Sequence, residues 1–190
     1  MDLMYLWVKG RWYFLVSVLD SYSRYIVRWE LALSMLAQEV VEIMAIALER
    51  IPGKKSRIVR DNGSQFIAKE WREVICRFEL EEIPIRVKYP ESNGRIERYH
   101  RSVREEGFAD QEVNDFYQAK DLLGQWVKYY NEEWLHSALD YLRPVDYYYK
   151  GNPEALLAER RRKLKEAAAS RREINNLVGP AKTKVGSVSF

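Results

Sequence analysis

The order of the apolar runs in the first half of the chain limits the fold that it can adopt. Residues 2–8 and 12–19 are two such runs, joined by a short turn that contains glycine. This pattern predicts a hairpin whose strands are buried on both faces. In residues 24–31, after a second turn, apolar and charged side chains alternate, which predicts a half-exposed third strand. The three runs together predict an antiparallel meander.

Helices and strands alternate after the meander. Apolar residues recur with helical periodicity over residues 36–51, and Ser34 is the expected N-cap. The sequence then predicts a short strand at 57–60, a helix at 69–78 and a last strand at 83–87. A meander continued by strands that alternate with helices is typical of an α/β fold with a mixed five-stranded sheet flanked by helices.

A further helix is expected to begin near Asn93, and its two faces differ. At about 100° per residue, one stripe is mainly apolar and should face the sheet. It consists of Ile96, Tyr99, His100 and Val103. The neighbouring stripe consists of Glu97, Arg101 and Arg104. Glu97 and Arg101 could simply form an i, i+4 ion pair worth about 0.2–0.5 kcal/mol, or the stripe could place two cations beside a metal-bound phosphate.

Three carboxylates stand at positions suited to a metal site. Asp2 lies in the first apolar run, Asp61 directly follows the strand at 57–60, and Glu97 lies one turn inside the helix. Thirty-five residues separate the last two carboxylates. Mg²⁺ prefers oxygen ligands and shares them with substrate phosphate oxygens. Two strands and a helix could therefore deliver the ligands of a pair of divalent cations.

Other polar residues are interpreted as structural. Asp20 follows the second apolar run, and we expect it to cap backbone donors of a turn rather than to bind a metal. His100 and His136 are expected to pack in the interior. Cys76, the single cysteine, is expected to be a small buried residue and favours a reducing compartment. Two histidines and one cysteine argue against a zinc site.

Several of these motifs together resemble a known family. Asp2, the run Asp-Asn-Gly-Ser-Gln-Phe at 61–66 and the run Tyr-Pro-Glu-Ser-Asn-Gly-Arg-Ile-Glu-Arg at 89–98 resemble the integrase catalytic core. Retroviral integrases share this core with bacterial insertion-sequence transposases of the Asp-Asp-Glu type. Residues 130–139 resemble the segment that follows the catalytic residues in the insertion-sequence branch. The resemblance covers roughly residues 1–150 and implies a ribonuclease H-like fold.

The resemblance also implies a function and a site. The chain would be a transposase or integrase core that cleaves DNA and transfers strands of an insertion sequence, using two Mg²⁺ ions for which Mn²⁺ would substitute. Its catalytic residues and metal ligands would be Asp2, Asp61 and Glu97. Basic residues at matching helix positions contact DNA in the family. The predicted DNA-binding residues are Asn62, Asn93, Arg95, Arg101 and Arg104.

The implied partners are the DNA ends of the insertion element and the target DNA. Two ends must be held together, so a homo-oligomer is expected. Neither a membrane nor a small-molecule substrate is expected, since no apolar run reaches the length of a membrane span and no signal peptide is recognisable. The expected location is the cytoplasm, in association with the nucleoid.

A second hypothesis is an inactive transposase remnant that binds DNA or a partner without chemistry. Asp2 stands beside the first residue of the chain, where strands often fray. Arg60 precedes Asp61 where the family more often has a small or polar residue, and Trp134-Leu135 stands where Arg-Pro is common. A structure-selective nuclease of the same fold is a third hypothesis, which the match at 130–139 disfavours.

Charge divides the chain unevenly. Residues 158–184 carry +6, whereas the whole chain of 190 residues carries +3, so the remainder carries −3. The expected organisation is an integrase-type catalytic core at 1–150 that is truncated at its N-terminus, a basic helical extension at 151–175 and a disordered tail at 176–190. An acidic metal-binding core with a basic extension is compatible with an enzyme that acts on nucleic acid.

Overall fold

The structure is a computed structural model of the 190-residue chain. It describes all residues except 35, 52–56, 61–62, 64–65, 85–93, 109–110, 151–152 and 179–190. Two compact units are distinguished, Met1–Tyr149 and Lys150–Phe190. No helix among the described residues is long and apolar enough to cross a membrane. The predicted tail at 176–190 lies mostly outside the described residues.

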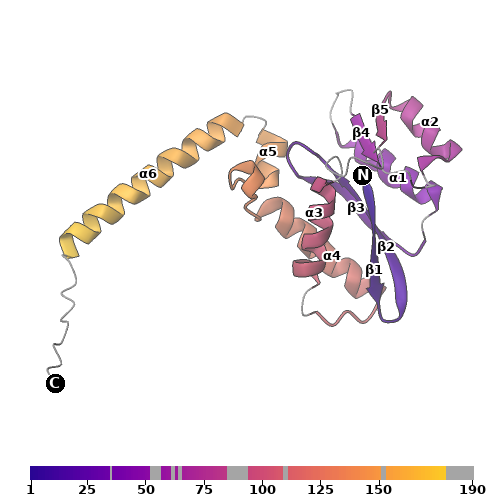
Figure 1. Ribbon diagram of the computed structural model, residues 1–190, viewed down its shortest axis with the longest axis horizontal. Coiled ribbons are helices and arrows are strands. Elements are labelled where there is room, and N and C mark those ends of the chain that lie inside the picture. The colour runs from indigo at the N-terminus through magenta and orange to yellow at the C-terminus, as the bar shows by residue number, and fades with distance from the viewer. Residues whose placement is uncertain are drawn as a thin grey trace, which may run out of the picture. The chain divides into compact units, whose positions relative to one another are not determined.

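Figure 1 shows the helices and strands along the chain. The strands are β1 (Asp2–Val8), β2 (Arg11–Leu19), β3 (Ile26–Ala32), β4 (Arg57–Arg60) and β5 (Glu81–Pro84). The helices are α1 (Ala37–Glu49), α2 (Lys69–Arg77), α3 (Gly94–Ser102), α4 (Phe116–Glu132), α5 (Pro144–Lys150) and α6 (Pro153–Val178). A π-helical turn (Val103–Gly107) continues α3, and a 3-10 turn (Ser137–Leu139) precedes α5.

The predicted meander is confirmed. β1 pairs antiparallel with β2 from Asp2 opposite Ser17 to Val8 opposite Arg11, and β2 pairs antiparallel with β3. The turn between β1 and β2 has two residues, Lys9 and Gly10, with φ of 43° and 81°. Two consecutive residues with positive φ match the right-handed twist of a tight hairpin, which explains the glycine at this position.

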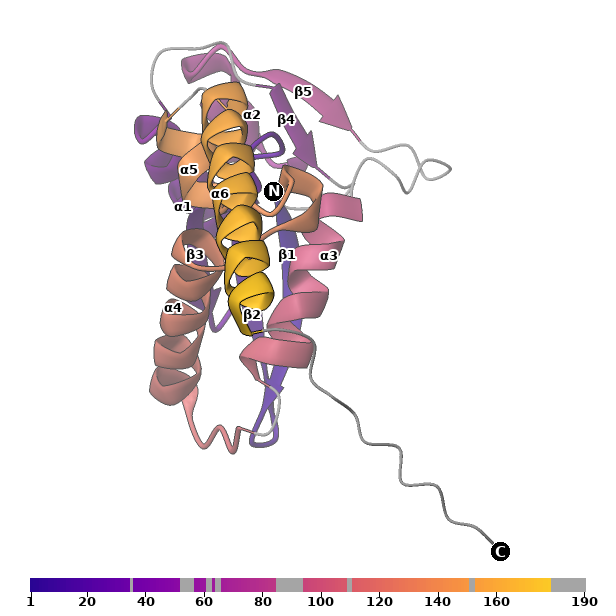
Figure 2. The same ribbon diagram turned by 90° about the vertical axis from the view of Figure 1, so that its left-hand side faces the viewer.

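A single five-stranded sheet is not confirmed, because β4 and β5 form a separate parallel pair. The backbone nitrogen of Met1 donates to the carbonyl oxygen of Val59 at 3.1 Å, so β1 and β4 are adjacent at this point. β4 lies beyond the N-terminal end of β1 in both views (Figures 1 and 2). Because the two strands overlap only at their ends, the described residues form no β1–β4 ladder.

Helices cover both faces of the three-stranded sheet. On one face, α3 and α4 pack against side chains of β1, β2 and β3 that include Met4 and Leu15. On the other face, α1, α2 and β4 pack around Val16, Val18 and Trp71. The helical stripe predicted near residue 96 is confirmed: Ile96, Tyr99, His100 and Val103 are all buried.

The predicted burial of the first hairpin on both faces is wrong near its tip. Tyr5, Trp7 and Trp12 are each more than half exposed, and their rings contact one another. The opposite face of the same strands is buried against α3 and α4. The second core cluster reaches β2 only at Val16 and Val18, so the tip lies outside it.

Two smaller expectations are also wrong. The Ser34 hydroxyl donates to the Glu39 carboxylate at 2.8 Å, and α1 begins after Leu36 with no side-chain cap. Cys76 is exposed on α2 rather than buried, because Trp71 and Val74 form the buried face of that helix.

Asn131 fastens the end of α4 to the start of β3. Its side-chain oxygen accepts from the Ile26 N–H at 2.8 Å, and its side-chain nitrogen donates to the Ile26 carbonyl at 3.1 Å. Asn131 is buried, and the amide group takes the place of a neighbouring strand. Asn131 therefore holds the edge strand β3 against α4.

We expect Asn131→Ala to lower the free energy of unfolding by about 2–4 kcal/mol, because both backbone groups of Ile26 lose a partner in a buried position. Urea unfolding measures this change. Asn114→Ala is the matched control, since Asn114 is exposed and its amide donates only to the carbonyl of Glu112 among the described groups. Equal stability of the two variants would contradict the assigned role.

Candidate functional site

Asp2 is held in the sheet. It is the first residue of β1, lies opposite Ser17 in β2 and is 9% exposed. The preceding residue is tied to β4 by the hydrogen bond from the Met1 nitrogen to the Val59 oxygen. The strand is therefore fixed on both edges at the point where it presents the carboxylate.

The helix α3 brings Glu97 to the same region. His100, which is 5% exposed, places Nδ1 3.5 Å from Oδ2 of Asp2. Residues three apart on a helix are surface neighbours, so Glu97 lies one turn before the residue that contacts Asp2. Glu97 itself is exposed, as expected for the charged stripe of the helix.

His100 is neutral near pH 7. Burial, together with the positive charges of Arg104 and of the Met1 amino group, lowers its pKa to about 3. The contact with Asp2 therefore joins a neutral imidazole to a carboxylate and is not an ion pair. Nε2 of His100 is buried and has no hydrogen-bond partner among the described residues. The imidazole thus contributes no charge beside Asp2.

Arg101 and Arg104 are exposed on the stripe that carries Glu97. Arg95, also exposed, lies elsewhere on α3 and donates from a guanidinium nitrogen to the carbonyl oxygen of Ser21 at 2.8 Å. The predicted residues on α3 therefore divide between two sides of the helix.

The remaining predicted residues, Asp61, Asn62 and Asn93, lie outside the described residues. Asp61 directly follows Arg60, the last residue of β4. Within the described ranges, no group of three or more His, Cys, Asp or Glu side chains is arranged to hold a metal ion. Of the three predicted carboxylates, the structure therefore describes Asp2 and Glu97 but not Asp61.

Asp20 is a turn residue, as predicted. Its Oδ2 accepts from the backbone nitrogen of Ser23 at 2.8 Å and from the hydroxyl of Ser23 at 2.5 Å. These bonds fix the turn between β2 and β3.

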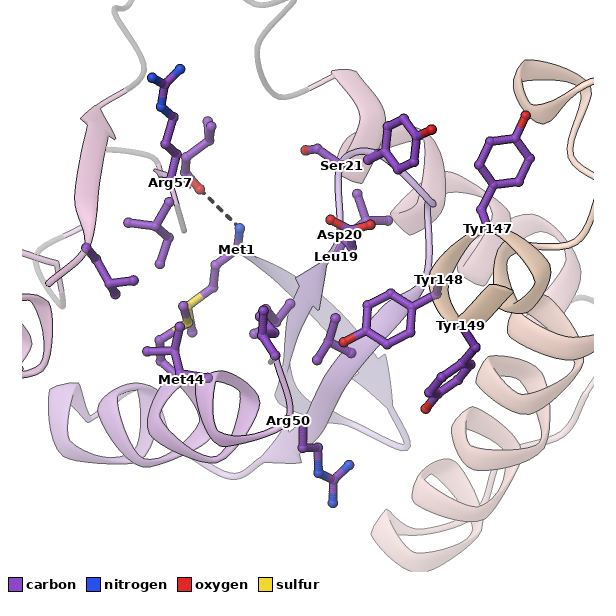
Figure 3. Close-up of a pocket in the computed structure, with 18 residues that line it drawn as sticks. Met1, Leu19, Asp20, Ser21, Met44, Arg50, Arg57, Tyr147, Tyr148 and Tyr149 are labelled. Carbon is purple, nitrogen blue, oxygen red and sulfur yellow. Dashed lines mark hydrogen bonds between the residues drawn. The ribbon is translucent and has the colours of Figure 1, made fainter. Parts of the chain in front are cut away.

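A pocket of about 650 Å³ lies beside the junction of β1 and β4. Met1 and Met44 stand on one side of it, and Tyr148 of α5 stands on the other (Figure 3). The described residues that line it include Asp20 but neither Asp2 nor Glu97. Neither of the two candidate carboxylates that the structure describes therefore lines this pocket.

Two family models match the chain, and both describe the integrase core domain. One matches residues 1–90 and the other residues 79–144. The chain belongs to the integrase core domain family. It is 30% identical over 135 residues to the putative transposase InsD for insertion element IS2E of Escherichia coli (strain K12). This match covers 68% of this chain and 62% of that protein.

A second relative is the transposase InsD for insertion element IS2A/D/F/H/I/K of Escherichia coli. It is also 30% identical over 135 residues, and the match covers 45% of its length. The chain thus spans less than two thirds of the curated relatives that it matches.

Solved structures show the same fold at low identity. The HTLV-2 integrase catalytic core domain in complex with magnesium (trimeric form) is 13% identical with a TM-score of 0.63, over 78% of this chain and 93% of that one. The catalytic domain of Mos1 mariner transposase is 13% identical with a TM-score of 0.56, over 66% of this chain and 67% of that one. The fold is therefore that of the ribonuclease H-like integrase and transposase cores, as predicted.

The depressed pKa of His100 predicts a pH dependence of stability. Between pH 6.5 and pH 3 the unfolded chain binds a proton at this residue and the folded chain does not, so stability falls as the pH falls. Between pH 7 and pH 5 the loss from this group is about 2 kcal/mol. Urea unfolding at both pH values in the presence of EDTA should show a smaller loss in His100→Gln. The same pH dependence in both proteins would contradict a neutral buried imidazole.

Proposed function

We propose that this chain is the catalytic core of an Asp-Asp-Glu transposase that cleaves DNA and transfers strands of an insertion sequence. The main support is the contact between α3 and β1, which brings the helix bearing Glu97 against Asp2 in a member of the integrase core family. The relatives named as transposases are longer than this chain, so the activity of the whole protein is part of the proposal.

The proposed ligands of two Mg²⁺ ions are Asp2, Asp61 and Glu97. All three offer only oxygen atoms, which suits Mg²⁺ and also Mn²⁺. Asp2 fits this role because its carboxylate is largely removed from water and lies beside an uncharged imidazole, so that a cation would favour its ionised form. When bound, a pair of such ions would activate the attacking hydroxyl group and stabilise the leaving oxygen of an in-line displacement.

The protein itself supplies rigidity and DNA contacts. Four buried side chains fix the rotation of α3 on the sheet, so Glu97 is presented at a constant position. Arg101 and Arg104, on the same stripe, would bind backbone phosphates and hold the scissile strand beside the carboxylates. Arg95 and the predicted residues Asn62 and Asn93 complete the proposed DNA-binding set.

The proposed partners are the ends of the insertion element, target DNA and further copies of this chain. The reaction would take place on DNA in the cytoplasm. One of the three grounds for the alternative of an inactive remnant is fraying at Asp2. The pairing of Asp2 with Ser17 and the bond from Met1 to Val59 do not favour that alternative.

The decisive variants are Glu97→Gln and Asp61→Asn, each of which removes one negative charge from the site. A branched DNA that mimics the product of strand transfer supplies its own geometry, and its resolution is followed with Mg²⁺ or Mn²⁺. We expect each variant to lose at least about a thousandfold in rate, because a metal ion contributes several kcal/mol to the transition state. EDTA should have the same effect on the unaltered protein.

Glu105→Gln is the matched control, since Glu105 is exposed in the π-helical turn that continues α3. It should keep its activity within about twofold, which is a change of less than 0.5 kcal/mol in the barrier. Unfolding by urea verifies that all variants are folded. Metal-dependent resolution by Glu97→Gln at the unaltered rate would refute the assigned site.

A further inference from the structure

A compact turn joins β2 to β3 and carries an arginine in a fixed position. The Asp20 nitrogen donates to the carbonyl oxygen of Tyr25, and the Arg24 nitrogen donates to the carbonyl oxygen of Asp20, both at 2.8 Å. Arg24 has φ of 63°, in the left-handed region that few residues other than glycine adopt. The Asp20 carboxylate is engaged by Ser23 within the turn. The turn therefore holds Arg24 in a backbone conformation that this residue type rarely takes.

Two guanidinium groups converge on one carbonyl oxygen. Arg24 from the turn and Arg95 from the first turn of α3 each donate to the oxygen of Ser21 at 2.8 Å. A carbonyl oxygen is neutral, so it cannot cancel two positive charges. Within the part of the chain that the structure describes, neither arginine forms an ion pair. Two like charges are thus held next to one another.

Arg98 adds a third positive charge to this cluster. Burial and the positive charges of Arg95 and Arg98 lower the pKa of Arg24, whereas Tyr130 and Asp20 act in the opposite direction. Both Arg95 and Arg98 are exposed. Arg24 and Arg95 meet at the oxygen of Ser21, and Arg98 lies one helical turn after Arg95, so the three side chains form a positive cluster.

The chemistry of this cluster suits a phosphodiester. A guanidinium has five N–H groups, and the Ser21 oxygen takes one from each of the two arginines that reach it. Arginine binds phosphate oxygens through paired N–H groups. The N-terminal end of α3, at Gly94, adds the positive end of a helix dipole on the same side.

The cluster is separate from the stripe assigned to the candidate active site. At about 100° per residue, Arg101 and Arg104 lie within about 40° of Glu97 around α3, whereas Arg95 and Arg98 lie about 100° to 160° away. We propose that Arg24, Arg95 and Arg98 form a second DNA phosphate-binding site, on the side of α3 away from Glu97. This site rests on the proposed DNA-binding function and adds a contact that the catalytic stripe does not provide.

The test is the salt dependence of DNA binding, measured by fluorescence anisotropy of a labelled duplex in EDTA, so that no cleavage occurs. Each phosphate contact contributes about 0.9 to the slope of log K against log salt. The double variant Arg24→Gln/Arg95→Gln should lose about 1 to 2 from the slope and bind several-fold more weakly at about 0.1 M salt. Arg72→Gln, a change of an exposed arginine on α2, should match the unaltered chain.

Arg98→Gln separates phosphate binding from a structural role. Arg24 also bonds within the turn and Arg95 fastens the turn to α3, whereas the Arg98 side chain makes no hydrogen bond or ion pair with a described residue. Its replacement should therefore leave the unfolding midpoint unchanged and lower the salt slope by about 1. An unchanged slope in Arg98→Gln and in a folded double variant would overturn the proposal, and so would the absence of DNA binding by the unaltered chain.

These outcomes are distinct from those of the cleavage test. A chain that binds DNA with the expected slopes but resolves no branched DNA would refute the proposed catalysis and leave this site standing. A chain that resolves branched DNA while Arg98→Gln and the double variant Arg24→Gln/Arg95→Gln both bind like the unaltered protein would refute this site and leave the proposed catalysis standing.

Discussion

The packing of α3 on the three-stranded sheet is the constraint on which the candidate site depends. Ile96, Tyr99, His100 and Val103 are each no more than 5% exposed, and together they fix both the position of the helix and its rotation. Once those four side chains are buried, geometry places Glu97 on an exposed edge, one turn from the residue that contacts Asp2. The apolar pattern of the helix therefore determines where its carboxylate stands, although Glu97 takes no part in the core.

The same packing creates an electrostatic cost that suits a cation-binding site. A carboxylate that is 9% exposed has lost most of its water, and its imidazole neighbour is neutral at pH 7. A protonated His100 would offset the negative charge of Asp2, but burial and the positive charge of Arg104 prevent this protonation near pH 7. A divalent cation bound by Asp2 would supply positive charge that this imidazole does not supply.

Local patterns in the sequence predicted local structure well. The hairpin turn, the helical stripe at 96–103 and the turn role of Asp20 each depend on residues close together in the chain. The errors concern contacts between distant residues. The extent of pairing between β1 and β4 depends on how far the strands overlap, and the tip of the first hairpin is exposed because the second core cluster does not reach it. Neither quantity is encoded in the periodicity of one segment. The amide pairing of Asn131 with Ile26 spans 105 residues, and no rule of spacing would reveal it.

The distribution of charge along the chain explains why local clusters of positive side chains matter for DNA binding. Outside residues 158–184 the chain carries −3, so the net charge of this part does not attract DNA. Within this part, affinity for a phosphate backbone must come from a few cations held where acidic residues do not neutralise them. The Ser21 oxygen performs this function for Arg24 and Arg95, since it orients both without cancelling either charge. A carboxylate at that position would hold the same two side chains more tightly, but it would remove much of the positive potential that a DNA phosphate requires.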